Sequence, residues 1–115
     1  MNQLTDKKIT RLRHSRDFSN VMKHGRRSRG KILNLVACQN NLPYSRIGYS
    51  VNKSTGSAVT RNQIKRRLRA IANNHTIQPG IDIVAIPLKN AAKMSYDEIE
   101  LDFKRSITLL QSELR

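Results

Sequence analysis

Helical and strand-like spacings of apolar residues alternate along the chain. The first periodic segment predicts a helix over residues 16–24, with Ser15 as its N-cap and Gly25 at the left-handed position after its end. The apolar side of this helix consists of Phe18, Val21 and Met22. Residues 1–14 are polar and basic and show no such period, so we expect them to form a flexible basic arm.

The next segments have the composition of β-strands. Residues 31–39 are rich in Ile, Leu and Val, and residues 45–52 alternate between apolar and polar positions. Asn, Pro and Ser between these two segments supply a turn, so we expect an antiparallel hairpin. The basic stretch 25–30, which precedes them, is predicted to be a turn or a short edge strand. The first strand of the hairpin would place Ile32, Asn34, Val36 and Cys38 on one face and Leu33, Leu35 and Ala37 on the other.

The second half of the chain predicts helix, strand and helix. A helix is expected over residues 58–74, and its buried face would consist of Ile64, Leu68, Ile71 and Ala72. The almost continuously apolar run 81–87 predicts a strand in a central position. Ser95 and Glu98 form a capping box at the start of the last amphipathic helix. The order of elements predicts an α+β fold, with one small sheet and helices packed against it in a single domain over residues 15–115.

The charge balance indicates the kind of partner. The 115 residues include 22 Lys and Arg against 8 Asp and Glu, a net charge of +14, and residues 97–115 alone carry an acidic excess. Nucleic acid relieves the repulsion in such a basic domain through phosphate contacts. An anionic membrane is the rival partner, but a membrane-surface helix would need aromatic anchors, and the chain has no Trp and two Phe. The length excludes a large enzyme, and the single cysteine, which cannot form an internal disulfide, fits the reducing cytoplasm.

The strongest candidate site is one face of the predicted helix 58–74. On a helical wheel its polar side chains gather on one side of the cylinder, and they are Arg61, Asn62, Lys65, Arg66 and Arg69. The sequence of this helix contains no Asp or Glu, so the like charges repel one another without compensation. A solvated helix face usually mixes charges of both signs, so we interpret this face as a phosphate-binding surface. Asn62 is either simply exposed, or its amide contacts a nucleotide or a metal-bound water.

Candidates for catalysis or metal binding are weak. No histidine has another histidine or a cysteine at a spacing typical of metal ligands. Four acidic residues lie close together in the sequence, and they are Asp97, Glu98, Glu100 and Asp102. Because they surround the start of a capped helix, where the helix dipole favours negative charge, we interpret them as structural. We therefore expect no catalytic residue and no metal site in the protein alone.

Three segments together resemble the protein subunit of bacterial ribonuclease P, over residues 10–112. The most specific segment is GYSVNKSTGSAVTRNQIKRRLR at residues 48–69, and the others are RLRHSRDFSNVMKHG at 11–25 and PGIDIVAIP at 79–87. The hallmark of that family is Arg-Asn-Arg. Arg61 and Asn62 match its first two positions, and Gln63 stands at the third.

The resemblance implies a fold and a function. Three helices would pack on a four-stranded sheet in the order α-β-β-β-α-β-α, with a left-handed crossover between the third and fourth strands. The chain would be a noncatalytic subunit that binds the catalytic RNA and the single-stranded 5′ leader of precursor tRNA. The RNA would carry out the endonucleolytic 5′ maturation of tRNA and would hold most of the Mg²⁺ that the reaction needs. No membrane or small-molecule partner is expected.

The resemblance also assigns sites. The basic side chains at 61–69 would face the catalytic RNA, and the leader would lie in a cleft between the first helix and the sheet, where Phe18 matches an aromatic lining residue. Met22 and Val36 stand where relatives often have Phe and Tyr, so base stacking there would be replaced by apolar contact. The charge of Lys53 suits a phosphate at the rim of the cleft.

Alternative functions predict different behaviour. A ribosomal-type RNA-binding protein would have no leader cleft, so added leader nucleotides would not change its affinity. A free-standing metal nuclease using the acidic residues 97–102 would cleave precursor tRNA without any RNA subunit. A sequence-specific DNA-binding protein fits less well, because the positive charge spans several elements rather than one recognition helix.

Overall fold

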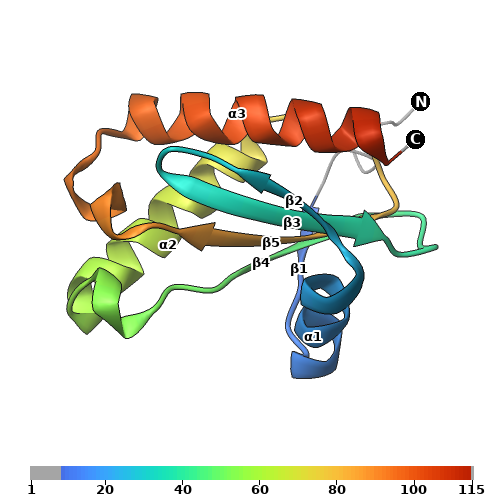
Figure 1. Cartoon of the computed structure of the whole chain (residues 1–115), viewed down its shortest axis with the longest axis horizontal. Helices are drawn as coiled ribbons and strands as arrows, with labels where there is room; N and C mark the ends of the chain where they lie inside the picture. The colour runs from blue at the N-terminus through green and yellow to red at the C-terminus, as the bar shows by residue number, and fades with distance from the viewer. Residues whose placement is uncertain (1–8, 115) are drawn as a thin grey trace.

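The computed structural model describes residues 9–114 as one mixed sheet with helices on both faces (Figure 1). The strand order across the sheet is β1-β4-β5-β3-β2. The elements in chain order are β1 (Ile9–Arg11), α1 (Ser15–His24), β2 (Arg26–Arg29), β3 (Leu33–Gln39), β4 (Ser45–Tyr49), the 3₁₀ helix η2 (Lys53–Thr55), α2 (Ala58–Asn73), β5 (Ile81–Pro87), the 3₁₀ helix η3 (Lys89–Lys93) and α3 (Tyr96–Glu113). The α+β class with three α-helices is as expected.

The centre of the sheet is β5, which separates the two strands that we expected to pair as a hairpin. β5 is antiparallel to β3 and parallel to β4. Six of its seven residues are buried, and its side chains alternate between the two faces of the sheet, so both faces must be covered. The hairpin prediction was wrong. The turn at residues 40–44 reverses the chain but does not require β3 and β4 to be adjacent. Because β5 is apolar on both faces, it takes the buried position between them. The basic edge strand near residues 26–29 is confirmed as β2.

The sheet has five strands rather than four, because part of the expected arm folds. Residues 9–11 form β1, which runs parallel to β4, and Leu12 is only 2% exposed. A flexible arm through residue 14 is therefore wrong for residues 9–14: β1 covers part of the edge of β4, and Leu12 fills the core beneath α1. Residues 1–8 lie outside the described residues. The unit β4–α2–β5 is the parallel crossover, whose left hand stays a prediction from the resemblance.

The N-terminal caps of the helices agree in part with those predicted from the sequence. Ser57 caps α2 by accepting a hydrogen bond from the backbone N–H of Thr60, and the capping box at the start of α3 is confirmed. Helix α1 begins one residue earlier than expected, with His14 and not Ser15 as its N-cap.

Gly25 ends α1 in an extended conformation, with φ −76°, and not in the expected left-handed one. The reason for glycine is close packing rather than a positive φ. A Cβ atom at this position would lie 2.5 Å from the carbonyl oxygen of Val21 and 2.7 Å from Cγ1 of Val36.

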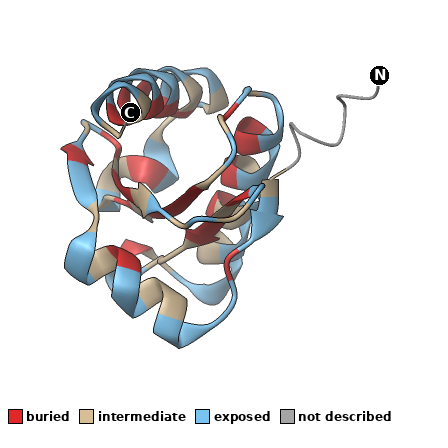
Figure 2. Cartoon of the chain, turned by 90° about the vertical axis from the view of Figure 1, so that its right-hand side faces the viewer, coloured by how far each residue is buried: buried red, intermediate tan, exposed pale blue. Residues whose placement is uncertain are grey.

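Two cores lie on opposite faces of the sheet. Leu33, Leu35 and Ala37 of β3 belong to the larger core, which α2 and α3 cover. Val36 belongs to a smaller core with Leu12, Val21 and Val84, which α1 covers. Figure 2 shows the buried positions on the strands and on the sides of the helices that face them. The predicted division into two faces is confirmed within β3, but Ile32, which was expected on the face of Val36, precedes the strand and packs in the larger core. The predicted buried face of α2 is confirmed.

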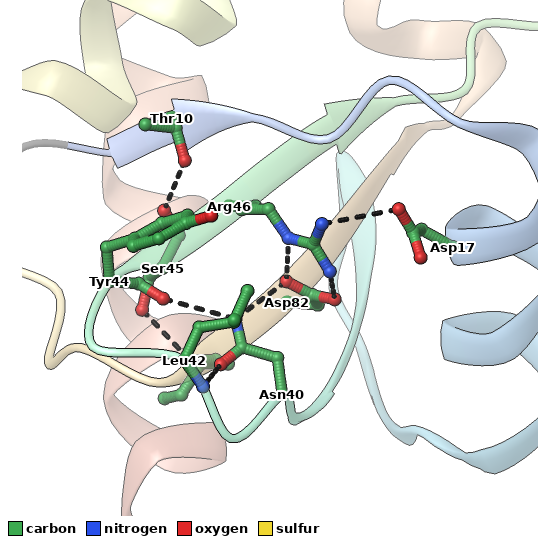
Figure 3. Close-up of polar contacts among 9 residues, drawn as sticks. Thr10, Asp17, Asn40, Leu42, Tyr44, Ser45, Arg46 and Asp82 are labelled. Atoms are coloured by element: carbon green, nitrogen blue, oxygen red, sulfur yellow. Dashed lines mark hydrogen bonds and ion pairs between the residues drawn. The ribbon is translucent and has the colours of Figure 1, made fainter.

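Arg46 forms ion pairs that link two strands of the sheet with each other and with α1 (Figure 3). Arg46 of β4 makes two hydrogen bonds to Asp82 of β5, from Nε at 2.8 Å and from a terminal nitrogen at 2.6 Å. Its other terminal nitrogen donates to Asp17 of α1 at 3.2 Å, and Asn40 donates to Asp82 at 2.8 Å. The hydrogen bond with Asp82 raises the pKa of Arg46 above its ordinary value. Asp82 is thus compensated, and α1 is held with its first turn beside β4.

The acidic start of α3 has a structural role, as expected, although one member acts differently from the others. Asp102 is 3% exposed, and its carboxylate accepts hydrogen bonds from the backbone N–H groups of Lys31, Ile32 and Leu33 and from Arg105. It therefore ties α3 to the connection between β2 and β3, and its oxygen atoms already have donors. In the part of the chain that the structure describes, no three His, Cys, Asp or Glu side chains gather as metal ligands. Within residues 9–114, none of the helices combines the length and apolar composition that crossing a bilayer requires.

Candidate nucleic-acid interface

The charged side of α2 lies opposite its buried face. Ile64, Leu68 and Ile71 point into the larger core, so the polar positions between them turn outward. The basic face of α2 consists of the half-buried or exposed residues Arg61, Asn62, Lys65, Arg66 and Arg69. The four ion pairs found in the described part of the chain involve other residues, so no carboxylate neutralises this face.

Two arginines of α2, Arg61 in the basic face and Arg67 outside it, have contacts that fix their directions. Arg67 donates to the carbonyl oxygen of Met94 at 3.4 Å, on the side of α2 that faces the start of α3. Arg61 donates from Nε to the carbonyl oxygen of Gly56 at 3.2 Å, just before its own helix. Arg67 is therefore tied to a side of α2 other than the basic face, and Arg61 marks the N-terminal end of that face.

Phe18 lies directly on the backbone of β4. A Cβ atom at Gly48 would be 2.3 Å from Cζ of the Phe18 ring, so only glycine lets the ring approach the strand so closely. The ring is half-buried and packs against the smaller core. Asp17 next to it is held by Arg46, so the aromatic side chain has a fixed support on both the helix and the strand.

The structure brings Phe18 next to the basic face of α2. A surface hollow of about 120 Å³ is lined by residues of α1, β4 and α2, namely Arg11, Leu12, Phe18, Gly48, Tyr49, Lys65 and Arg69. Phe18 and Lys65 were assigned to separate surfaces by the sequence. Their meeting in one hollow means that an aromatic ring and the cationic groups of Arg11, Lys65 and Arg69 can contact the same nucleotide.

The other residues expected in the cleft occupy different environments. Met22 is half-buried and packs beside Phe18 on the smaller core. Val36 is 0% exposed beneath α1, so the expectation that it lines the cleft is wrong in this structure: α1 packs directly on it. Lys53 is exposed at the start of η2, in the connection from β4 to α2.

A row of residues across the sheet extends the surface formed by Phe18 and Met22. Arg29, Asn34 and Ile86 are registered opposite one another on β2, β3 and β5, on the same face of the sheet as Val36. Unlike Val36, these three are exposed or half-buried. Asn34 Oδ1 accepts a hydrogen bond from the backbone N–H of Gly30 at 3.3 Å. This face therefore offers a cation, an amide and an apolar side chain in one line.

Sequence reasoning missed three residues of this surface. Arg11 was placed in the expected arm, Tyr49 was taken for an ordinary strand position, and Gly48 had no assigned role. The alternation of residues 45–52 gave the face of Tyr49 correctly, but its neighbours come from β1 and α2. No local signal could have shown that contact.

Comparisons with known proteins agree on one family. The family model described as Ribonuclease P matches residues 7–111. A ribonuclease P protein component from Syntrophus aciditrophicus is 37% identical over 101 residues, which cover 86% of this chain and 85% of that protein. Among solved structures, a Staphylococcus aureus RNase P protein mutant with defective mRNA degradation activity has a TM-score of 0.82 at 27% identity, with 88% of this chain and 87% of that chain covered. The RNase P protein from Thermotoga maritima has a TM-score of 0.77 at 30% identity, covering 89% and 96%.

Proposed function

The chain belongs to the bacterial ribonuclease P protein family and is the protein subunit of this tRNA 5′-processing endonuclease; on this premise we propose that its two surfaces hold two RNAs side by side. The basic face of α2 binds the catalytic RNA. The surface around Phe18 binds the unpaired 5′ leader of precursor tRNA. We place this activity in the cytoplasm.

The basic face is suited to the phosphates of a folded RNA. Its four cations stand on one side of a rigid helix, and no carboxylate from the described residues pairs with them. Each phosphate that they neutralise releases condensed counterions, so binding should weaken steeply as salt is added. Asn62 lies between the cations and can position a ribose or a base edge.

The leader surface is suited to single-stranded nucleotides. Phe18 offers an aromatic face for one base, Met22 and Ile86 offer apolar contact, and Lys53 and Arg29 offer charge at the rim. Stacking of a base on an aromatic ring contributes about 1–3 kcal/mol and tolerates different bases, which suits leaders of varied sequence. Because Val36 is buried and Met22 is not aromatic, Phe18 carries most of this stacking in our proposal.

The protein contributes to catalysis by electrostatics rather than by its own acids or bases. The Mg²⁺ of the reaction does not fit the described residues as a bound ion, because they form no metal-ligand cluster and the Asp102 oxygens already accept four hydrogen bonds. We therefore assign the ion to the RNA. The cations of the chain lower the electrostatic repulsion between the catalytic RNA and precursor tRNA, so the substrate can bind the catalytic RNA at a lower Mg²⁺ concentration.

The observation that carries this proposal is the hollow in which Phe18 meets Lys65 and Arg69. The test adds the chain to a bacterial ribonuclease P RNA at low Mg²⁺ and follows cleavage of precursor tRNA. Phe18→Ala should weaken binding of leader-containing substrate but not of mature tRNA. Charge reversal at both Lys65 and Arg66 should weaken assembly with the catalytic RNA and lower its salt dependence.

The matched comparison uses the single reversal Lys65→Glu and the control Lys104→Glu, which makes the same change of charge at an exposed position of α3. Equal losses from Lys104→Glu and from reversal on α2 would mean that net charge alone matters and would contradict a binding face. Equal effects of Phe18→Ala on leader-containing and mature tRNA would contradict the leader surface.

A further inference from the structure

A second hollow lies beside the one that contains Phe18. Its volume is about 170 Å³, and it is lined by Ile9, Thr10, Arg11, Ile47, Tyr49, Arg69 and Asn73. These residues come from β1, β4 and the C-terminal half of α2. The hollow is therefore on the α2 side of the sheet, whereas Phe18 approaches from the α1 side.

The two hollows are joined where β1 ends. Arg11, the last residue of β1, pairs with Ile47, so β4 has no neighbouring strand on this side at Gly48 and Tyr49. Both hollows share Arg11, Tyr49 and Arg69 as lining residues. A single-stranded RNA bound at Phe18 can thus continue past the unpaired edge of β4 into the second hollow while it stays on the protein surface.

The shared residues have the chemistry of an anion site. The guanidinium carbon of Arg69 lies 5.9 Å from the centroid of the Tyr49 ring, which orients the arginine over the aromatic face. Arg11 of β1 lines both hollows together with Tyr49. Burial raises the pKa of Tyr49 to about 12, although Arg69 and Arg11 lower it, so the phenol keeps its proton and can donate a hydrogen bond. Among the described residues that line either hollow, none is acidic.

We propose that Arg11, Tyr49 and Arg69 form a binding subsite for a backbone phosphate of an unpaired RNA strand, adjoining the Phe18 surface and reached over the free edge of β4. This inference rests on the proposed function, because the strand that it places is RNA held by the same protein. Two arginines and a phenol can donate to the phosphate oxygens, and Asn73, which also lines the second hollow, is available for the adjoining ribose or base. The strand is either the distal part of the tRNA leader or a single-stranded segment of the catalytic RNA.

The test compares two neighbouring arginines. Arg11→Ala removes a guanidinium from the subsite, and Arg13→Ala removes the same charge from an exposed position that lines neither hollow. Binding of precursor tRNA to the reconstituted ribonucleoprotein should weaken roughly tenfold in Arg11→Ala, the scale of a charged hydrogen bond, and much less in Arg13→Ala. The slope of log affinity against log salt should fall by about 0.7 only in Arg11→Ala, because one single-strand phosphate contact is lost.

A second variant removes a donor without removing charge. Tyr49→Phe keeps the ring under Arg69 and deletes only the hydroxyl, so a loss of about threefold in affinity is expected with the salt slope unchanged. Matching thermal unfolding curves of all variants and the parent exclude a folding defect as the cause.

Two binding assays identify the RNA that occupies the subsite: binding of precursor tRNA with leaders of different length, and assembly of the protein with the catalytic RNA. A loss that appears with long leaders and vanishes when the leader is cut back assigns the subsite to the distal leader. A loss in assembly of the protein with catalytic RNA alone assigns it to that RNA. Equal effects of Arg11→Ala and Arg13→Ala in both assays, or a Tyr49→Phe variant identical to the parent, would overturn the subsite. In that case a leader-specific loss in Phe18→Ala would still stand as support for the proposed function.

Discussion

Replacing Gly48 with alanine should displace the Phe18 ring while leaving every side chain that we propose to contact RNA chemically unchanged. The Cβ atom that alanine adds would lie 2.3 Å from Cζ of Phe18 and 2.8 Å from one of its Cε atoms. Carbon atoms in ordinary contact are about 3.5–4.0 Å apart, so the ring must retreat by about 1.2 Å or more. Phe18 is a half-exposed side chain that can swing toward solvent, so the fold should absorb the change.

The displaced ring would occupy space in which the stacked nucleotide should lie. Base stacking on an aromatic side chain contributes about 1–3 kcal/mol, and a loss of about 1.4 kcal/mol, near half of the upper value, corresponds to roughly tenfold weaker binding. We therefore expect Gly48→Ala to bind leader-containing precursor tRNA roughly tenfold more weakly, with binding of mature tRNA unchanged. Equilibrium binding of both RNAs to the reconstituted ribonucleoprotein measures this difference.

A double-mutant cycle identifies the route of the effect. In a Phe18→Ala background the added methyl group meets no ring, so Gly48→Ala should cause no further loss of leader affinity. Two results would refute the reasoning. Gly48→Ala could bind the leader as well as the parent does, or the losses from the two changes could simply add.

Asp102 provides the remaining predictions, and both are measured by urea unfolding. Asp102→Ala leaves the backbone N–H groups of Lys31, Ile32 and Leu33 without their acceptor, so the free energy of unfolding should fall by about 3–5 kcal/mol, while loss of less than about 1 kcal/mol would mean that α3 does not depend on this anchor. Burial alone would raise the pKa of Asp102, but hydrogen bonds from these N–H groups and from Arg105 hold it below the ordinary value of 3.8. The unfolded chain therefore takes up a proton at higher pH than the folded one, and stability that is present above pH 3.8 is lost as the pH falls through the pKa of the folded protein. Asp102→Asn should flatten this acid loss, and an unchanged slope would contradict the assignment.

The sequence predicted which side of each helix or strand is buried more accurately than it predicted which elements lie next to one another. The period of α2 identified both its buried residues and its basic face, and the capping box located the start of α3. Alternation in β3 separated Leu35 from Val36 correctly. These features depend on residues a few positions apart, so local geometry alone determines them.

The errors concern contacts between distant segments. Adjacent segments 31–39 and 45–52 predicted a hairpin, yet β5 lies between them because it can bury both its faces. The resemblance supplied the equivalent position of Val36 but not its complete burial under α1. Gly48, Arg11 and Tyr49 gained their roles only when β1, β4 and α2 came together, which no periodicity within one segment reports.

The position of β5 affects how the chain can fold during its synthesis and which truncated fragments can fold. Strands β3 and β4 are complete after residue 49, but the strand that joins them begins only at Ile81. A nascent chain must therefore hold two unsatisfied strand edges until the polypeptide has grown past Pro87, and long-range pairing of this kind is slow. A fragment that stops before Ile81 would lack the middle of the sheet, so the aromatic and basic surfaces that α1, β4 and α2 build together could not survive as a shorter peptide.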